Sequence, residues 1–88
     1  MAATTDQRLK RAILEVVRNQ IRENDPPETK KTLDRLVGEG FSKDEAMKLI
    51  GYVVASEVFD VLRKGRRYDK KKYLAALAAL PKLPWENK

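Results

Sequence analysis

The chain has 88 residues, a net charge of +6, and neither cysteine nor histidine. A chain of this length forms one domain and buries roughly 60–65% of its unfolded surface, enough for a modest core. Hydrophobic residues make up 42% of the sequence and charged residues 36%, as in a soluble globular domain. The two missing residue types exclude disulfides, zinc sites built on thiolates or imidazoles, and catalysis by Cys or a histidine base. We therefore expect a single domain over residues 1–88.

The sequence predicts a cytoplasmic protein with no membrane segment. Residues 1–7 contain no basic region followed by an apolar one, so we expect no secretory signal. The longest apolar stretch, residues 53–62, is interrupted by Ser56, Glu57 and Asp60 and is too short to cross a bilayer. The absence of cysteine fits a reducing compartment.

Two amphipathic helices are predicted in the first half of the chain. Apolar residues between Leu9 and Ile21 recur at helical spacing and predict a helix over residues 5–23, with Thr4 and Gln7 as a capping box. A second helix is expected over residues 26–37, with Asp25 as its cap and Pro26 in its first position. Glycines at positions 38 and 40 favour the end of this helix.

The third predicted helix, residues 43–64, has the clearest local signals. Ser42 and Glu45 form a capping box, Phe41 and Ala46 occupy the two positions of a hydrophobic staple, and Gly65 ends the helix. Its apolar residues cover most of the circumference: Leu49, Ile50, Tyr52, Val53, Val54, Val58, Phe59, Val61 and Leu62. Such a helix is either central in the fold or also contacts a partner.

A fourth helix is predicted over residues 70–80, capped by Asp69 and ended by Pro81, with Tyr68 and Tyr73 packing as a staple. We expect the remaining tail to be extended and Trp85 to dock back onto the helices together with Leu83. No strand pattern and no internal repeat is present. The fold class is therefore all-α, a four-helix bundle with short loops.

Positive charge is concentrated near the C-terminus. Residues 1–64 carry 12 Lys/Arg against 11 Asp/Glu, and residues 65–88 carry seven against two. The densest part is the basic segment, residues 63–72, whose candidate polyanion-binding residues are Arg63, Lys64, Arg66, Arg67, Tyr68, Lys70, Lys71 and Lys72. Cations of this kind contact nucleic-acid phosphates without reading sequence, and tyrosines can stack on bases. The alternative is an ordinary solvated surface with both tyrosines packed against the helices.

A sequence-reading helix-turn-helix is not expected. The second helix of such a pair should carry polar and basic residues at its start, where it enters the DNA groove. Here Asp44 and Glu45 occupy that end, and their carboxylates would face phosphates.

The sequence predicts no enzyme, cofactor or metal site. Glu57 and Asp60 are the only carboxylates in the third helix beyond its first turn, and we expect Asp60 to pair with Lys64 one turn further on. A di-metal bundle site needs more carboxylates and usually histidine. The glycines around residue 39 lack the Lys-Ser/Thr of a phosphate-binding loop.

The apolar surplus of the third helix predicts self-association. Small residues at positions 51 and 55 allow another helix to approach closely, either from the same chain or from a second copy. Three shorter helices cannot cover the whole circumference, so a homodimer is expected to bury the remainder. The candidate self-association residues are Gly51, Val54, Ala55 and Val58.

Several short motifs carry a family resemblance over about two-thirds of the chain. They are Asp25-Pro26-Pro27-Glu28-Thr29, Gly40-Phe41-Ser42 with Glu45-Ala46, Leu49-Ile50, residues 57–62, Gly65, Tyr68-Asp69, Tyr73 and Leu80-Pro81. With these motifs the chain resembles a small bacterial family of uncharacterised helical proteins, a domain of unknown function. The resemblance implies a standalone bacterial cytoplasmic protein and supplies no activity. Residues 40–46 are also similar, locally, to ubiquitin-associated-like modules, whose helices are shorter than the one predicted here.

Together these observations predict a non-enzymatic helical protein that acts by protein interaction or self-association. The alternative function is binding of RNA or DNA, without sequence specificity, through the basic segment.

Overall fold

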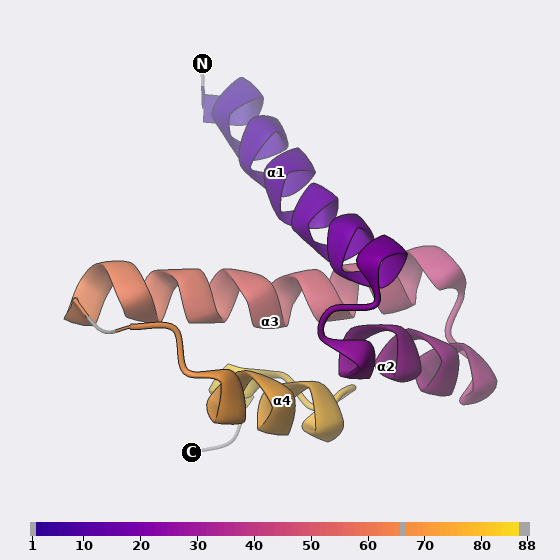
Figure 1. Ribbon diagram of the computed structural model, residues 1–88. Helices are drawn as coiled ribbons and strands as arrows, with labels where there is room; N and C mark the ends of the chain where they lie inside the picture. Colours follow the sequence, from indigo (N-terminus) through magenta and orange to yellow (C-terminus); the bar gives the residue numbers. More distant parts are fainter. Residues whose placement is uncertain (1, 66, 87–88) are drawn as a thin grey trace.

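The four predicted helices all form, in the predicted order (Figure 1). The computed structural model describes residues 2–65 and 67–86, with side chains described from residue 7 onward. Within this part of the chain the helices are α1 (Ala2–Glu23), α2 (Pro27–Gly38), α3 (Lys43–Lys64) and α4 (Lys70–Ala79), followed by a 3-10 turn, η1 (Pro84–Glu86). The all-α fold class is confirmed, and no strand occurs among these residues.

The predicted ends of α3 and the predicted start of α4 are confirmed in atomic detail. The backbone N–H of Glu45 donates to Ser42 Oγ at 3.0 Å, and the backbone N–H of Ser42 donates to Glu45 Oε1 at 2.9 Å. Gly65 ends α3 in the left-handed conformation, with φ at 61°. Asp69 Oδ1 accepts from the backbone N–H of Lys72 at 3.1 Å, which caps α4.

The starts of α1 and α2 differ from the sequence predictions. The helix α1 already begins at Ala2, so Thr4 and Gln7 do not mark its start. The helix α2 begins at Pro27 with Pro26, not Asp25, in the capping position. A residue that precedes a proline avoids the helical conformation, so Pro26, which precedes Pro27, stays extended with ψ at 151°.

The sequence predicted an extended C-terminal tail, and this prediction was wrong. Residues 84–86 form a 3-10 turn, in which the backbone N–H of Glu86 donates to the Leu83 carbonyl at 2.9 Å. The side chain of Leu83 is partly buried against the core. The tail therefore folds back on the helices.

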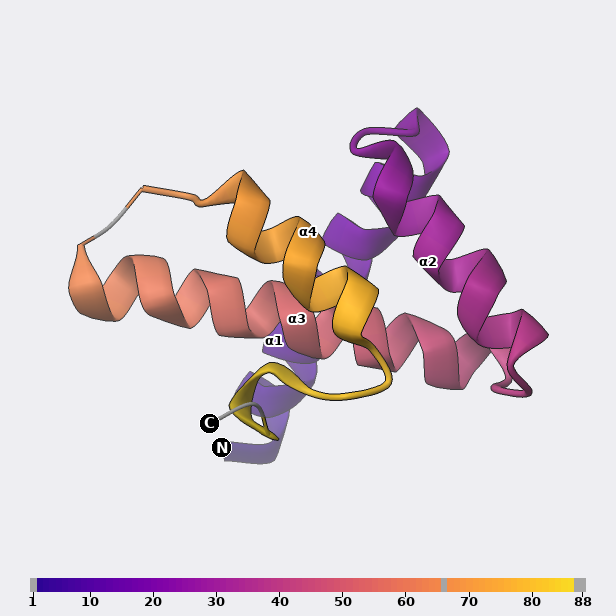
Figure 2. The same cartoon turned by 90° about the horizontal axis from the view of Figure 1, so that it is seen from below.

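The helix α3 is the centre of the fold, because each of the other three helices packs against it. The second half of α1 crosses the first half of α3 on one side, α2 lies beside this crossing, and α4 lies across α3 on the other side (Figures 1 and 2). The core fills the space where the four helices converge. Its fully buried side chains include Val17, Leu36, Ile50, Val53, Leu77 and Leu80.

A small polar cluster joins three helices within this core. Gln20 Oε1 on α1 accepts from Thr29 Oγ1 on α2 at 2.7 Å and from the Tyr73 hydroxyl on α4 at 2.8 Å. Thr29 is fully buried and Tyr73 nearly so, and burial raises the pKa of the Tyr73 phenol above its ordinary value of 10.0. Both hydroxyls are thus satisfied by one amide oxygen, which fixes α1, α2 and α4 relative to one another.

Among residues 2–65 and 67–86, no helix is both long enough and apolar enough to cross a membrane.

Candidate interaction surfaces

An apolar face extends along α3 beyond its crossing with α1. At the crossing, Gly51 lies against Ile13 and Leu14, and a Cβ at this position would lie 3.4 Å from Ile13 Cγ2. Past Gly51 the two helices diverge, so the first half of α1 and the second half of α3 leave an open angle between them (Figure 1). We define the apolar face as Leu9 on α1, Tyr52, Ala55, Val58, Phe59 and Leu62 on α3, and Trp85 in the tail.

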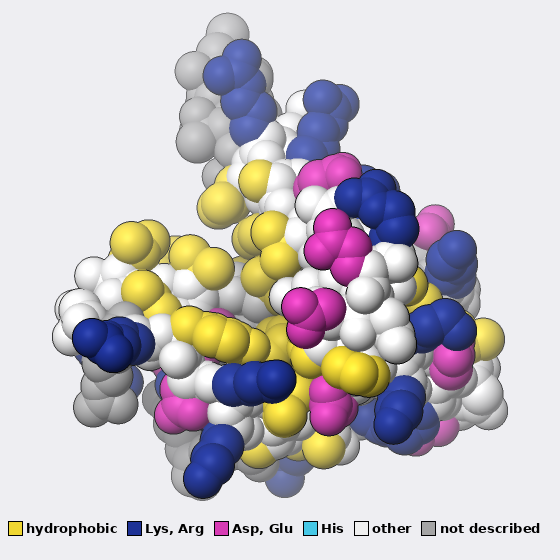
Figure 3. All heavy atoms as spheres, in the orientation of Figure 1, with side chains coloured by type: hydrophobic (Ala, Val, Ile, Leu, Met, Phe, Trp, Pro, Cys, Tyr) yellow, Lys and Arg dark blue, Asp and Glu magenta, His cyan; other side chains and the backbone are white. Residues whose placement is uncertain are grey.

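This face carries large apolar side chains that remain exposed. Figure 3 shows hydrophobic side chains gathered along the outer half of α3 and on the adjoining side of α1. Phe59 is 59% exposed and Leu62 is 76% exposed. A hollow of about 380 Å³ lies at the base of the open angle, lined by residues that include Leu9, Tyr52 and Ala55. Contiguous apolar patches beyond a few hundred Å² mark interaction sites on soluble proteins.

The structure divides the four predicted self-association residues into two pairs. Gly51 packs on α1 of its own chain, and Val54 belongs to the buried core. Ala55 is half-buried in the hollow, and Val58 is 47% exposed. Only the second pair is therefore accessible to another molecule in this arrangement.

Trp85 docks onto α3, as its hydrophobic character suggested, but it is not buried. Its ring meets Tyr52 edge-on, with 5.9 Å between ring centroids and 70° between the ring planes. More than half of the Trp85 side chain remains exposed, at 53%. The tail thus adds an aromatic side chain to the apolar face.

The basic segment forms the end of the molecule where α3 passes into α4 (Figure 2). Arg63, Lys64, Arg67, Lys70 and Lys71 are all exposed. Arg66 lies outside the described residues. Lys72 is paired with the Asp60 carboxylate on α3 and is therefore less available to a ligand than its neighbours.

The two tyrosines of the basic segment differ in their surroundings. Their rings lie 5.9 Å apart, so the predicted contact between Tyr68 and Tyr73 forms. Tyr73 is buried with its hydroxyl bound to Gln20, whereas Tyr68 is half-exposed. The pKa of Tyr68 is raised by partial burial and then by the negative charges of Glu57, Asp25 and Asp69. Of these two tyrosines, Tyr68 is the one that could stack on a base, and these carboxylates would repel the attached phosphates.

The two carboxylates in the second half of α3, Glu57 and Asp60, differ in their exposure. Glu57 is buried, whereas Asp60 is partly exposed. Asp60 pairs with Lys72 on α4 and not with Lys64, so the expected pairing along α3 was wrong. The Lys72 ammonium lies across the helix interface and lowers the pKa of Asp60 by its hydrogen bond. Within residues 2–65 and 67–86 no group of three or more potential metal-ligating side chains comes together.

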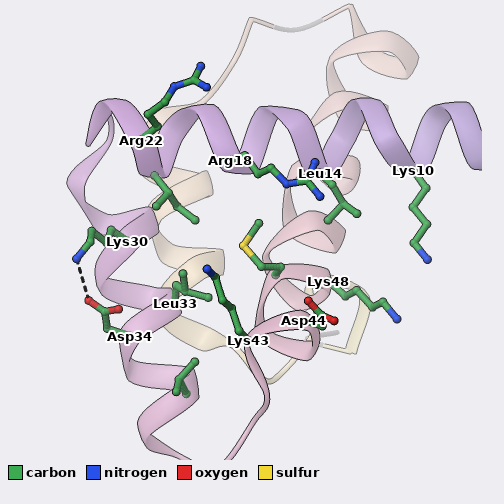
Figure 4. A pocket seen from close by; sticks show the side chains of 13 residues that line it. Lys10, Leu14, Arg18, Arg22, Lys30, Leu33, Asp34, Lys43, Asp44 and Lys48 are labelled. Carbon is green, nitrogen blue, oxygen red and sulfur yellow. Dashed lines mark hydrogen bonds and ion pairs between the residues drawn. The ribbon is translucent and has the colours of Figure 1, made fainter.

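A second hollow, which we call the cationic groove, was not anticipated from the sequence. It measures about 950 Å³ and lies between α1, α2 and the start of α3 (Figure 4). Six of its lining residues are basic and two are acidic, although residues 1–64 as a whole are nearly neutral. One sequence signal could have indicated it: Lys10, Leu14, Arg18 and Arg22 recur every four residues and so share one side of α1.

No family model, curated protein or solved structure matches the chain. The resemblance to a bacterial helical family and the local likeness to ubiquitin-associated-like modules stay predictions.

Proposed function

We propose that the protein is a non-enzymatic interaction module that self-associates through the apolar face. One observation carries this proposal: on the two helices that diverge from the α1–α3 crossing, large apolar side chains stay exposed, and no other helix of the described residues covers them. Transferring such side chains out of water is favourable and roughly proportional to the area removed. A partner surface would supply that burial.

The occupant that we propose is a second copy of the chain. The first half of α1 projects from the body beside the open angle, and it carries the exposed Leu9 (Figure 1). In a two-fold pair, α1 of each copy can lie along the outer half of α3 of the other, over Ala55, Phe59 and Leu62. This contact forms twice by symmetry and covers the exposed parts of α1 and α3 in both copies. Two-fold dimers are the commonest oligomers.

Light scattering coupled to size exclusion tests this proposal. We expect the wild-type mass to be twice 10.1 kDa at high protein concentration and to change little with salt. The variant Val58→Asp should behave as a monomer, because it places a charge in the apolar face. The matched control is Val37→Asp on α2, where the valine is 45% exposed against 47% for Val58.

Two outcomes would contradict self-association. One is a wild-type mass of 10.1 kDa at every concentration. The other is a dimer that Val58→Asp leaves intact while circular dichroism shows an unchanged helical content.

A second candidate function, nucleic-acid binding, is favoured by the five exposed cations that meet where α3 passes into α4. Neutralised phosphates release counterions, so affinity should fall steeply with salt. For a labelled single-stranded RNA, Lys70→Ala with Lys71→Ala should reduce the slope of log affinity against log salt by roughly 1.4. Lys43→Ala with Lys48→Ala removes the same charge elsewhere and is the control. Absence of binding at low salt would exclude this function.

A further inference from the structure

The cationic groove combines two features that an ordinary solvated surface does not. Its floor is apolar and is built from all three helices, by Leu14, Ile21, Leu33, Val37 and Met47. Its rim carries the basic side chains (Figure 4). The groove therefore offers burial to apolar groups and attraction to negative charge in one place.

The floor is accessible and adaptable. Leu33 is nearly buried and forms its base, whereas Val37 is 45% exposed at its edge. Ile21 and Met47 are partly buried and pack on the core, so they connect the groove to the rigid part of the fold. A methionine side chain has three rotatable bonds and can adjust to the shape of an incoming apolar group.

The charge at the rim is cancelled only in part by the described residues: Asp34 and Asp44 also line the groove, and Arg18 is paired with Glu15 at 3.6 Å. Lys43 reaches from the start of α3 into the opening (Figure 4). No carboxylate of the described residues lies within 4.0 Å of the ammonium groups of Lys10, Lys43 or Lys48. Lys30 is paired, but with the exposed Asp34 at 3.5 Å, an ion pair that contributes little and exchanges readily for another.

We propose that the cationic groove binds an acidic amphipathic helix of a partner protein. Two apolar side chains one turn apart on that helix would rest on Val37 and Met47. The Asp and Glu residues beside them would face Lys10, Lys43 and Lys48. This is the helix-in-groove mode of recognition, in which one apolar stripe gives the affinity and flanking charges give the orientation.

The lining of the groove favours a peptide over a nucleic acid. No aromatic side chain of the described residues lines it, so these residues offer no ring on which bases could stack. An apolar floor gives a phosphate backbone no favourable contact, whereas it contributes directly to the binding of leucine or methionine side chains by burying them. The basic segment, which has Tyr68, lies at the other end of the molecule.

This inference goes beyond the proposed function and does not depend on it. The groove adjoins the hollow of the apolar face at Lys10, Leu14 and Lys48. Val37 and Lys43 line only the groove, so variants at these two positions test it separately.

Fluorescence anisotropy with designed peptides tests the proposal. The probe is a fluorescein-labelled helix of about 16 residues, with leucines on one face and Glu or Asp elsewhere. A first control peptide has the same composition with the leucines distributed all round. A second has Lys in place of the acidic residues, and a single-stranded RNA is the polyanion control. The protein is the full chain.

We expect the acidic amphipathic probe to bind more tightly than all three controls. Val37→Asp should weaken its affinity by more than tenfold, because it removes an apolar contact and adds a repelling carboxylate. The matched variant Val58→Asp on the apolar face should change the affinity less than twofold. Lys43→Glu should weaken binding by about tenfold, whereas Lys70→Glu, with the same change of net charge, should have little effect.

Three results would overturn the proposal. The first is no saturable binding of the probe up to about 1 mM. The second is equal affinity for the probe and the control with scattered leucines, which would show that charge alone attracts the peptide. The third is tighter binding of RNA that Lys43→Glu abolishes, which would make the groove a nucleic-acid site.

Discussion

The apolar side chains on the two sides of the α1–α3 crossing differ in what covers them. The converging side consists of the second half of α1 and the first half of α3, and the diverging side consists of the first half of α1 and the second half of α3. On one side, the second half of α1 and the first half of α3 converge with α2 and α4, and Ile50 and Leu36 are fully buried. On the other side the same two helices diverge, and Phe59 and Leu62 remain exposed. Apolar residues of similar size therefore have opposite roles, which depend on where along its helix each one lies. Helical periodicity gives the face of a residue but not the position of the crossing.

The largest expected difference is between two Leu→Ala substitutions, one on each side of the crossing. It is a difference in how much each substitution lowers the free energy of unfolding. Leu36→Ala leaves a cavity in the core and should lower the free energy of unfolding by about 2–5 kcal/mol. Leu62→Ala removes a side chain that is 76% exposed and should change it by less than about 0.5 kcal/mol. Urea titrations followed by circular dichroism, at a concentration low enough that both variants are monomers, make the comparison. Similar losses for both monomeric variants would mean that Leu62 is covered by its own chain.

The ends of α3 and the start of α4 could be predicted from the sequence. Ser42, Asp69 and Gly65 act on their nearest neighbours in the chain, so their capping roles follow from local rules and are confirmed. The start of α2 was misplaced because two adjacent prolines compete for one position, and the sequence prediction did not consider how Pro27 restricts Pro26.

The interaction surfaces could be predicted only in part, because they depend on long-range packing. The surplus of apolar residues on α3 was evident from the sequence, but which of them lie at the crossing was not. Gly51 and Val54 were predicted to contact a second copy, whereas Gly51 packs on α1 and Val54 belongs to the core. The cationic groove gathers residues from three helices, such as Arg18, Lys30 and Lys43, whose charges appear balanced along the chain. Only the spacing along α1 could have indicated it.

The polar cluster on Gln20 should contribute to the stability of the converging side. Tyr73→Phe removes the hydroxyl that donates to Gln20 at 2.8 Å and should lower the free energy of unfolding by about 1 kcal/mol near neutral pH. Burial raises the pKa of Tyr73, so the folded state holds this proton more tightly than the unfolded state does. The resulting stabilisation is complete below the unfolded pKa of 10.0 and is lost as the pH rises through the folded pKa above it.

The measurement for Tyr73 is therefore a pair of urea titrations for wild type and Tyr73→Phe, at about pH 8 and about pH 11. The difference between the two proteins should shrink at the higher pH, because only the wild type loses the contribution of Tyr73. A difference that stays constant would show that Tyr73 titrates alike in the folded and unfolded states.

A gain in stability is expected at the crossing itself. Gly51→Ala removes backbone freedom from the unfolded chain and places a Cβ 3.4 Å from Ile13 Cγ2 and 3.8 Å from Leu14 Cδ2, both ends of side chains. Thermal unfolding should show a stabilisation of about 0.5–1 kcal/mol. The control, Gly51→Leu, is too large for the contact and should be destabilising. If Gly51→Ala destabilised the fold strongly, α1 would have to lie closer to α3 than these distances show.

The smallest effect tests whether the tail belongs to the diverging side. Trp85 meets Tyr52 edge-on, and such aromatic pairs couple by about 0.5–1.5 kcal/mol, with the lower end expected for rings that are half exposed. A double-mutant cycle of Trp85→Leu and Tyr52→Leu measures this coupling in the free energy of unfolding. Tyr52→Leu should also shift the Trp85 emission to longer wavelength, because the indole loses its neighbour and gains water. A coupling of zero with unchanged emission would separate the tail from α3, and Trp85 would no longer count as part of the apolar face.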